Sequence, residues 1–236
     1  QLYTNTHTAD LVAAIRAQQA DIVTIQELTP RLAEASRQQL IAQYPYQVLL
    51  PGDTDWGLGV LSRYPLHLAE RDQEYSAQRM MVDLGDQQLT LINVHPHAPE
   101  VETRRLRQFR PIKVVLNYDT TMRGRELPQL LETIDAIDGP LVVAGDFNTS
   151  DREPPYAELR KRMHDAFGEA GWGFGFTFPN DHQLARLRVP FPLVRIDYIW
   201  SKGGVLPATA RVLCDFGGSD HCAVVADLVL ETTEGR

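Results

Sequence analysis

The sequence is poor in the features that mark membrane proteins and repeat proteins. No apolar run approaches the roughly 20 residues that a membrane-spanning helix requires, and no internal repeat, low-complexity segment or signal peptide is visible. The composition, 43% hydrophobic and 23% charged, is that of an ordinary globular protein. With 236 residues the chain is long enough to bury a large core, so we expect residues 1–236 to form one domain.

Basic charge is also scarce in this chain. It carries 31 acidic and 23 basic residues, which gives a net charge of −8 and a pI of about 5.3. A general binder of duplex DNA is usually basic, because neutralising the phosphates drives that affinity. The acidity argues against such a protein, although clustered carboxylates can form a site in which a bound divalent cation reverses the local charge.

Cysteine is limited to Cys214 and Cys222, which flank residues 215–221. The absence of further cysteines and of a Cys-x-x-Cys motif argues against a thiolate zinc centre. If the strands on either side of this loop pair as a hairpin, the two cysteines could meet in a disulfide. The alternative is two small buried apolar side chains, and the sequence leaves both open.

Apolar periodicity predicts helices and strands that alternate around a block of consecutive strands. Helical spacing occurs at 8–19, 30–43, 129–137 and 154–163, and strand-like runs at 21–27, 47–50, 57–62, 67–72, 79–84, 88–95, 141–145, 194–200, 205–213 and 222–230. Residues 96–121 and 164–192 have weak periodicity and are expected to be surface loops. This order indicates an α/β or α+β domain in which helices cover a mixed sheet or a pair of sheets.

Polar residues follow several of the predicted strands. Asp146 and Asn148 come directly after the apolar run 140–144 and lie two residues apart, so on an extended backbone both point to the same side. In sheets flanked by helices, ligands bind at the carboxyl ends of the strands. A carboxylate and an amide directed at one point can orient a water molecule and hold an anionic oxygen.

Taken in chain order, these segments resemble the endonuclease/exonuclease/phosphatase superfamily of metal-dependent phosphoesterases, in particular bacterial members related to DNase I-like and sphingomyelinase-like enzymes. The matching segments are Asn5, Ile25-Gln26-Glu27, Leu61-Ser62-Arg63-Tyr64-Pro65, Asn93-Val94-His95, Gly145-Asp146-Phe147-Asn148, Arg195-Ile196-Asp197-Tyr198-Ile199 and Ser219-Asp220-His221. Each match is weak alone, but their order over nearly the whole chain is specific. The resemblance implies a DNase I-like four-layer α/β sandwich, in which two packed mixed sheets lie between helices.

The resemblance also implies a divalent metal site. Glu27 would bind the metal directly, with Asn5 and Asp220 near it or holding metal-bound waters. Hard oxygen ligands of this kind suit Mg²⁺, and Mn²⁺ can substitute for it.

Five further residues are implied to be catalytic. His221 would pair with Asp197, which fixes the tautomer of the imidazole and supports its protonated form. Asp146 and Asn148 would position the attacking water, and His95 would donate to a phosphoryl oxygen. Either Asp146 or His221 takes the proton of the water, and the sequence leaves this choice open.

Two segments are candidates for substrate contacts. The basic stretch 104–113, with Arg104, Arg105 and Arg107, predicts contact with the anionic backbone of a nucleic acid or with a lipid headgroup, or else a solvated helix face. The aromatic loop that begins at Trp172 could stack on a base or sugar, reach toward lipid, or pack beneath itself.

These features predict a hydrolase that cleaves a phosphodiester by metal-assisted in-line attack of water, as a nuclease or as a phosphodiesterase acting on phospholipid or a small molecule. The alternatives are a phosphomonoesterase and a non-catalytic binding protein. A non-catalytic relative should have lost part of the motif set, and none of it is missing. The sequence identifies no protein partner, and we expect a monomer.

The chain begins at Gln1 rather than Met, which indicates that a preceding segment has been removed. The His-Pro-x-x-Pro stretch at 95–99 and the Gly-Trp-Gly loop at 171–173 resemble a bacterial branch in which this domain follows transmembrane helices. We therefore expect an exported protein or the soluble domain of a membrane-anchored bacterial protein.

Overall fold

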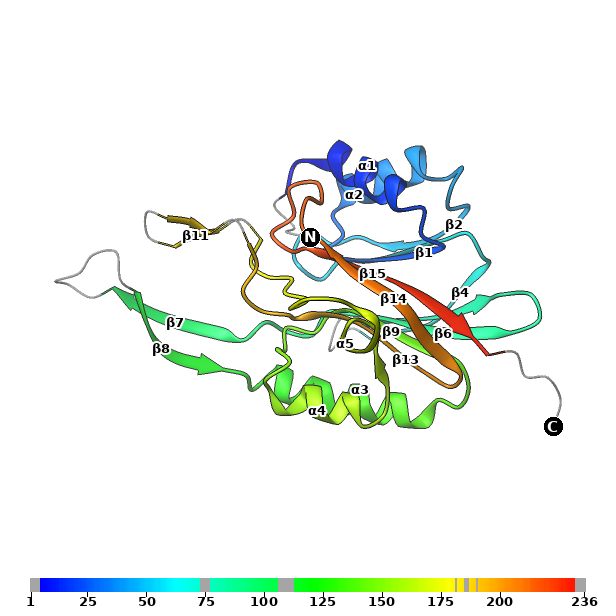
Figure 1. The fold of residues 1–236 in the computed structure, drawn as a ribbon. Coiled ribbons are helices and arrows are strands. Elements are labelled where there is room, and N and C mark those ends of the chain that lie inside the picture. Colours follow the sequence, from blue (N-terminus) through cyan, green and yellow to red (C-terminus); the bar gives the residue numbers. More distant parts are fainter. Residues whose placement is uncertain are drawn as a thin grey trace.

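Two β-sheets lie between two layers of helices (Figure 1). The computed structural model describes residues 5–72, 77–105, 113–180, 182–184, 187–189 and 191–231. None of the helices in this described part of the chain has the length and apolar character needed to cross a bilayer.

The first sheet has three antiparallel strands in the order β1-β3-β2. This half contains α1 (Thr8–Gln18), β1 (Ile22–Gln26), α2 (Pro30–Gln39), β2 (Tyr46–Leu50) and β3 (Leu58–Ser62). Helix α2 begins where the Thr29 hydroxyl accepts a hydrogen bond from the Leu32 N–H at 3.2 Å, with Pro30 at the first helical position. The apolar faces of both helices pack on this sheet through Leu11, Val12, Ile15, Ile25, Leu32, Ala33 and Leu61.

The second sheet has six strands in the order β10-β13-β9-β6-β5-β4. Its strands are β4 (Leu66–Asp72), β5 (Ala77–Asp83), β6 (Gln88–Val94), β9 (Leu141–Asp146), β10 (His164–Asp165) and β13 (Asp197–Lys202). β6 and β9 are parallel, and the other pairs are antiparallel. Helices α3 (Arg123–Ala136) and α4 (Pro154–Arg160) cover its outer face through Leu127, Leu130, Ile134, Leu159 and Trp200.

The two sheets are joined by an apolar core and by the buried amides of Gln78, which donates to the Val48 carbonyl oxygen at 3.2 Å, and of Asn93. The core between them includes Val60, Met80, Val82, Leu91 and Val142. Asn93, on β6, is fully buried and donates to the carbonyl oxygens of Ile25 and Gly59 on the first sheet, at 3.2 and 3.1 Å. Its own oxygen accepts from Gln26 at 2.6 Å. Asn93 therefore fixes the first sheet against the strand that leads to His95.

Three hairpins complete the described chain. The first is formed by β7 (Glu100–Arg105) and β8 (Lys113–Asp119), the second by β11 (His182–Leu184) and β12 (Leu187–Val189), and both project from the body of the molecule (Figure 1). The third pairs β14 (Val205–Leu213) with β15 (Ala223–Leu230) and closes with a disulfide between Cys214 and Cys222. The short helix α5 (Ala166–Ala170) packs against β14.

The four-layer sandwich predicted from the sequence is confirmed, and the order of its main strands agrees with the prediction. The prediction of surface loops at 96–121 and 164–192 was wrong in part, because both segments contain hairpin strands. β7 is largely polar and lacks the apolar alternation that sequence patterns detect, and the apolar run at 114–116 in β8 was not recognised as a strand. Helix α3 also begins before the predicted start at residue 129, since Pro128 lies inside it rather than ahead of it.

Candidate active site

Strand β9 carries Asp146 to the carboxyl end of the second sheet, between two neighbouring strands. In the register, Asp146 faces Asp197 on β13, and Gly145 faces Val94 on β6. Gly145 has a φ of +150°, and a Cβ atom there would lie 2.0 Å from the Val94 carbonyl oxygen. Glycine therefore permits the close approach of β6 and β9 that places His95 beside Asp146.

His221 and Asp197 form a buried pair. The His221 Nδ1 lies 3.0 and 3.2 Å from the two carboxylate oxygens of Asp197. Burial alone would lower the pKa of His221, but the carboxylates of Asp197 and Asp146 raise it to about 9. Burial alone would raise the pKa of Asp197, and the attraction of His221 holds it below its ordinary value. These opposite shifts of the two pKa values favour an imidazolium beside a carboxylate.

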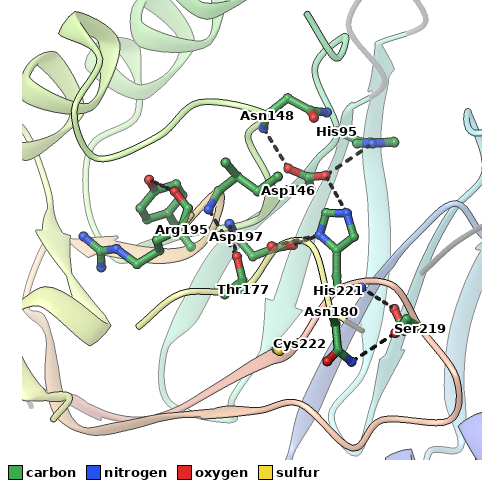
Figure 2. A network of polar contacts seen from close by, with 12 residues as sticks. His95, Asp146, Asn148, Thr177, Asn180, Arg195, Asp197, Ser219, His221 and Cys222 are labelled. Carbon is green, nitrogen blue, oxygen red and sulfur yellow. Dashed lines mark hydrogen bonds and ion pairs between the residues drawn. The ribbon is translucent and has the colours of Figure 1, made fainter. Parts of the chain in front are cut away.

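Asp146 occupies the centre of the site. Figure 2 shows its carboxylate between His95 and His221, and its Oδ2 lies 3.8 Å from the Nε2 atom of each ring. Its Oδ1 accepts the backbone N–H of Asn148 at 2.7 Å. Burial first, and then the charge of Asp197, raise the pKa of Asp146 to about 7. A carboxylate with this pKa can take up and release a proton near neutral pH.

His95 is oriented by the loop before β3. Its Nδ1 lies 3.0 Å from the Asp55 carbonyl oxygen, so that nitrogen carries the proton and donates it. Burial lowers the pKa of His95, although the charge of Glu27 opposes this effect. The Nε2 atom facing Asp146 can therefore donate only when the ring is protonated, a form that a bound phosphate anion would favour.

Asn148 is held by two hydrogen bonds of its own. Its backbone N–H binds Asp146, and its side-chain Nδ2 donates to the Pro96 carbonyl oxygen at 2.9 Å. Asn148 has a positive φ of 47°, an uncommon conformation for a residue other than glycine. These contacts fix the loops after β6 and β9 together, and the role of Asn148 in positioning water stays a prediction.

The predicted metal ligands lie around this centre. Glu27 directly follows β1 with a φ of +54°, and its charge is close enough to influence His95. Asn5 donates through its amide to the Gly217 carbonyl oxygen at 3.0 Å, which places it against the loop that leads to His221. The Asp220 Oδ1 is buried and has no hydrogen-bond partner among the described residues.

This set of donors fits a hard divalent cation. An orphaned buried carboxylate oxygen such as that of Asp220 calls for a cation or a water, because an unpaired buried charge is costly. One ligand atom from each of Asp146, Asp197 and His221 also lies within 4.8 Å of the others, and the carboxylates of this group could supply oxygens to a cation, whereas a protonated His221 could not. Oxygen-rich donors of this kind suit Mg²⁺ or Mn²⁺ better than a soft metal.

Sequence reasoning missed Thr177, which supports the His–Asp pair. Its buried hydroxyl accepts the backbone N–H groups of Ile196 and Asp197 at 3.2 and 3.3 Å. Its own carbonyl accepts the N–H of Cys222 at 2.8 Å. Thr177 therefore joins the strand that carries Asp197 to the residue after His221, and only the aromatic loop around it drew attention in the sequence.

Sequence reasoning also missed Asn180, which directly follows the aromatic loop. Its backbone N–H donates to the Asp220 carbonyl oxygen at 2.6 Å, and its amide donates to the carbonyl oxygens of Cys214 and Ser219. The Ser219 hydroxyl in turn accepts the His221 N–H at 3.1 Å (Figure 2). These bonds hold the loop that positions His221.

Arg195, which belongs to the segment that ends in Asp197, is only 5% exposed. Its Nη2 lies 2.7 Å from the Asp165 carboxylate and 3.0 Å from the Tyr156 hydroxyl. Its guanidinium also lies 4.9 Å from the centre of the Tyr198 ring. Arg195 thus anchors the start of β13 rather than contacting the catalytic centre directly.

Of the predicted substrate residues, Arg104 and Arg105 lie in a hairpin strand and Trp172 lies in an exposed loop. Arg104 and Arg105 lie in β7, opposite Val114 and Lys113, so the expectation of a helix face was wrong. Arg107 lies outside the described residues. Trp172 is 96% exposed, so it does not pack beneath its loop.

Several solved structures share this fold. TDP2 from D. rerio, complexed with single strand DNA product, has 17% sequence identity and a TM-score of 0.66 over 96% of this chain and 94% of its own. An endonuclease/exonuclease/phosphatase from Bacteroides vulgatus has 19% identity and a TM-score of 0.64, covering 95% of this chain and 91% of its own. A mannosyl-6-phosphatase from Bacteroides thetaiotaomicron has 13% identity and a TM-score of 0.59, covering 95% and 90%. Identities this low establish the fold alone.

Comparison with curated protein sequences finds no match. A family model described as "Endonuclease/Exonuclease/phosphatase family" matches residues 2–221, a range that includes every catalytic and metal-binding candidate named above. The fold, the position of the site at the carboxyl ends of the central strands, and this match agree. The chain belongs to the endonuclease/exonuclease/phosphatase family.

Proposed function

We propose that this protein is a divalent-metal-dependent phosphodiesterase. The observation that carries the proposal is the convergence of His95, Asp146, Asp197 and His221 from separate strands and loops onto one buried centre. Glu27, Asp220 and Asn5 are the residues that would hold the cation. When bound, Mg²⁺ or Mn²⁺ would neutralise charge on the phosphate oxygens and make a water molecule more acidic.

The protonation states of His221 and Asp146 indicate a separate role for each residue in the reaction. His221, held as an imidazolium by Asp197, stabilises the negative charge that develops on the phosphoryl group. Asp146, with its pKa near that of a neutral solution, accepts the proton of the attacking water. The water oxygen bonds to phosphorus while one ester bond breaks, and the departing oxygen takes up a proton from bulk water. Protonated His95 donates a hydrogen bond to a non-bridging oxygen.

The charges around the centre favour a diester over a monoester. Four acids, Glu27, Asp146, Asp197 and Asp220, lie around two possible cationic side chains, His95 and His221. A bound divalent cation would offset two of the four acid charges. A phosphodiester carries one negative charge, whereas a phosphomonoester carries up to two near neutral pH. The weaker repulsion of the diester by this acidic site supports phosphodiester cleavage.

Hydrolysis of two soluble esters tests the proposal. We would compare bis(p-nitrophenyl) phosphate with p-nitrophenyl phosphate, in Mg²⁺, in Mn²⁺ and in EDTA. The wild type should cleave the diester faster, and only with metal. His221→Ala should lower kcat by about 100-fold to 10,000-fold, because the residue stabilises charge in the transition state. His67→Ala is the matched control, since His67 is exposed on the edge strand β4.

Each result has a defined meaning. Full activity of His221→Ala would reject the site assignment, and a preference for the monoester would reject the diester proposal. If calorimetry shows that metal binds but neither ester is cleaved, the proposal that the protein hydrolyses simple phosphate esters is rejected. Glu27→Gln should weaken metal binding in that calorimetric titration, and an unchanged titration would remove Glu27 from the metal ligands.

A further inference from the structure

An uncharged aromatic surface lies next to the active site. Trp172 is 96% exposed and Phe174 82%, and Phe191 on the neighbouring segment is 58% exposed. Phe176 and Leu193 complete this group, which we call the aromatic surface. Large apolar side chains gathered in the open are unusual, and they mark a place that another molecule covers.

The aromatic surface is a formed groove rather than a loose loop. A cavity of about 640 Å³ is lined by its five residues together with others, including Phe167 on α5, Arg211 on β14 and Cys214 directly after β14. Phe174 and Phe176 stack with ring centres 5.2 Å apart. Gly175, between them, has a φ of +67°, and a Cβ atom there would lie 2.4 Å from the Phe167 ring. The loop is therefore packed in a conformation that directs Trp172 and Phe174 outward.

The groove is connected to the catalytic centre in two ways. Phe178, two residues after Phe176, packs against His221 with ring centres 4.7 Å apart. Cys214, which lines the groove, is bonded to Cys222, the residue after His221. A molecule that covers the groove would therefore lie beside the site where the phosphate ester is expected.

Charge indicates the kind of molecule. Residues 171–180 and 191–194 contain no Asp, Glu, Lys or Arg, and among the described residues Arg211 is the single charged side chain lining the groove. A nucleic-acid strand requires a basic groove in addition to stacking rings, which this surface of an acidic protein does not supply. A zwitterionic phospholipid bilayer has no net charge, and Trp and Phe partition into its interface.

We propose that the aromatic surface docks the protein on a zwitterionic phospholipid bilayer and so presents a headgroup phosphodiester to the active site. Trp172 and Phe174 enter the interface, and Arg211 faces the lipid phosphates. The substrate part of this inference rests on the proposed phosphodiesterase function, whereas the docking part does not require catalysis.

Vesicle binding without metal tests the docking part by itself. We would sediment the protein with phosphatidylcholine vesicles in EDTA and compare wild type with the double variant Trp172→Ser/Phe174→Ser. Each removed aromatic side chain should weaken partitioning by at least about 10-fold. The control is Leu206→Ser/Val229→Ser, which removes an exposed apolar pair, 37% and 55% exposed, from opposing positions at the far end of the β14–β15 hairpin.

Binding by wild type and by the control, with loss in the aromatic double variant, supports docking. Failure of wild type to bind, or equal binding by the double variant, overturns it. Binding of a single-stranded oligonucleotide through quenching of Trp172, without vesicle binding, also overturns it in favour of base stacking. With Mg²⁺ added, release of phosphate-containing headgroup from the vesicles supports the substrate part. Vesicle binding and cleavage of the soluble diester without headgroup release overturn that part alone.

Discussion

The buried carboxylate of Asp146 should make the metal-free protein less stable as the pH rises. Burial first, and Asp197 second, raise its pKa from the ordinary value of 3.8 to about 7. The folded state therefore holds this proton more tightly than the unfolded chain, so the stability is lost as the pH rises from 3.8 toward 7. Asp146→Asn removes the titration and keeps an oxygen that can accept the Asn148 N–H.

The size of the effect follows from the pKa. Between about pH 5 and the pKa near 7, each pH unit costs the wild type about 1.4 kcal/mol, or about 3 kcal/mol in all. Relative to wild type, Asp146→Asn should therefore gain about 3 kcal/mol in free energy of unfolding between about pH 5 and pH 8. Divalent cations should offset the loss in the wild type, because they favour the ionised carboxylate.

Urea denaturation in EDTA, followed through the fluorescence of the buried Trp200, measures this difference at each pH. Asp86→Asn provides the control, since it removes the same charge from an exposed turn between β5 and β6. If the free energies of unfolding of wild type and Asp146→Asn differ by the same amount at pH 5 and pH 8, Asp146 does not hold a raised pKa and the reasoning fails.

Three further substitutions test the supports of the site. Burial alone would lower the pKa of His221, but neighbouring carboxylates, Asp197 first, raise it to about 9. Asp197→Asn should therefore lower the pKa of His221, as measured by NMR titration. An unchanged titration curve would contradict this. Thr177→Val leaves two buried backbone donors unpaired and should cost about 1–3 kcal/mol in urea denaturation, whereas Thr177→Ser should restore most of it. Replacing Cys214 and Cys222 by Ser opens a loop with a sequence separation of 8 and should cost about 2–3 kcal/mol, and an unchanged melting temperature would contradict that estimate.

The sequence alone was sufficient to predict the central strands and the residues that follow them. The buried strand β9 begins with a continuous apolar run and β6 is rich in Leu, Ile and Val, and both patterns are local. Asp146 and His95 stand where these runs end, and the parallel pairing of β6 with β9 brings both to one edge of the sheet. The alternation of helices and strands indicated a mixed sheet or a pair of sheets covered by helices, and the family resemblance implied the four layers.

Only the tertiary structure decided how that edge becomes a site. Asn93 fixes one sheet to the other, and Thr177 and Asn180 hold the His–Asp pair from a loop that the sequence marked only as aromatic. The disulfide, open in the sequence, depends on the register of β14 against β15. The exposure of Trp172 depends on the packing of its loop, in which Gly175 lies against the Phe167 ring. Each of these features depends on contacts between different strands, helices and loops, which local periodicity does not encode.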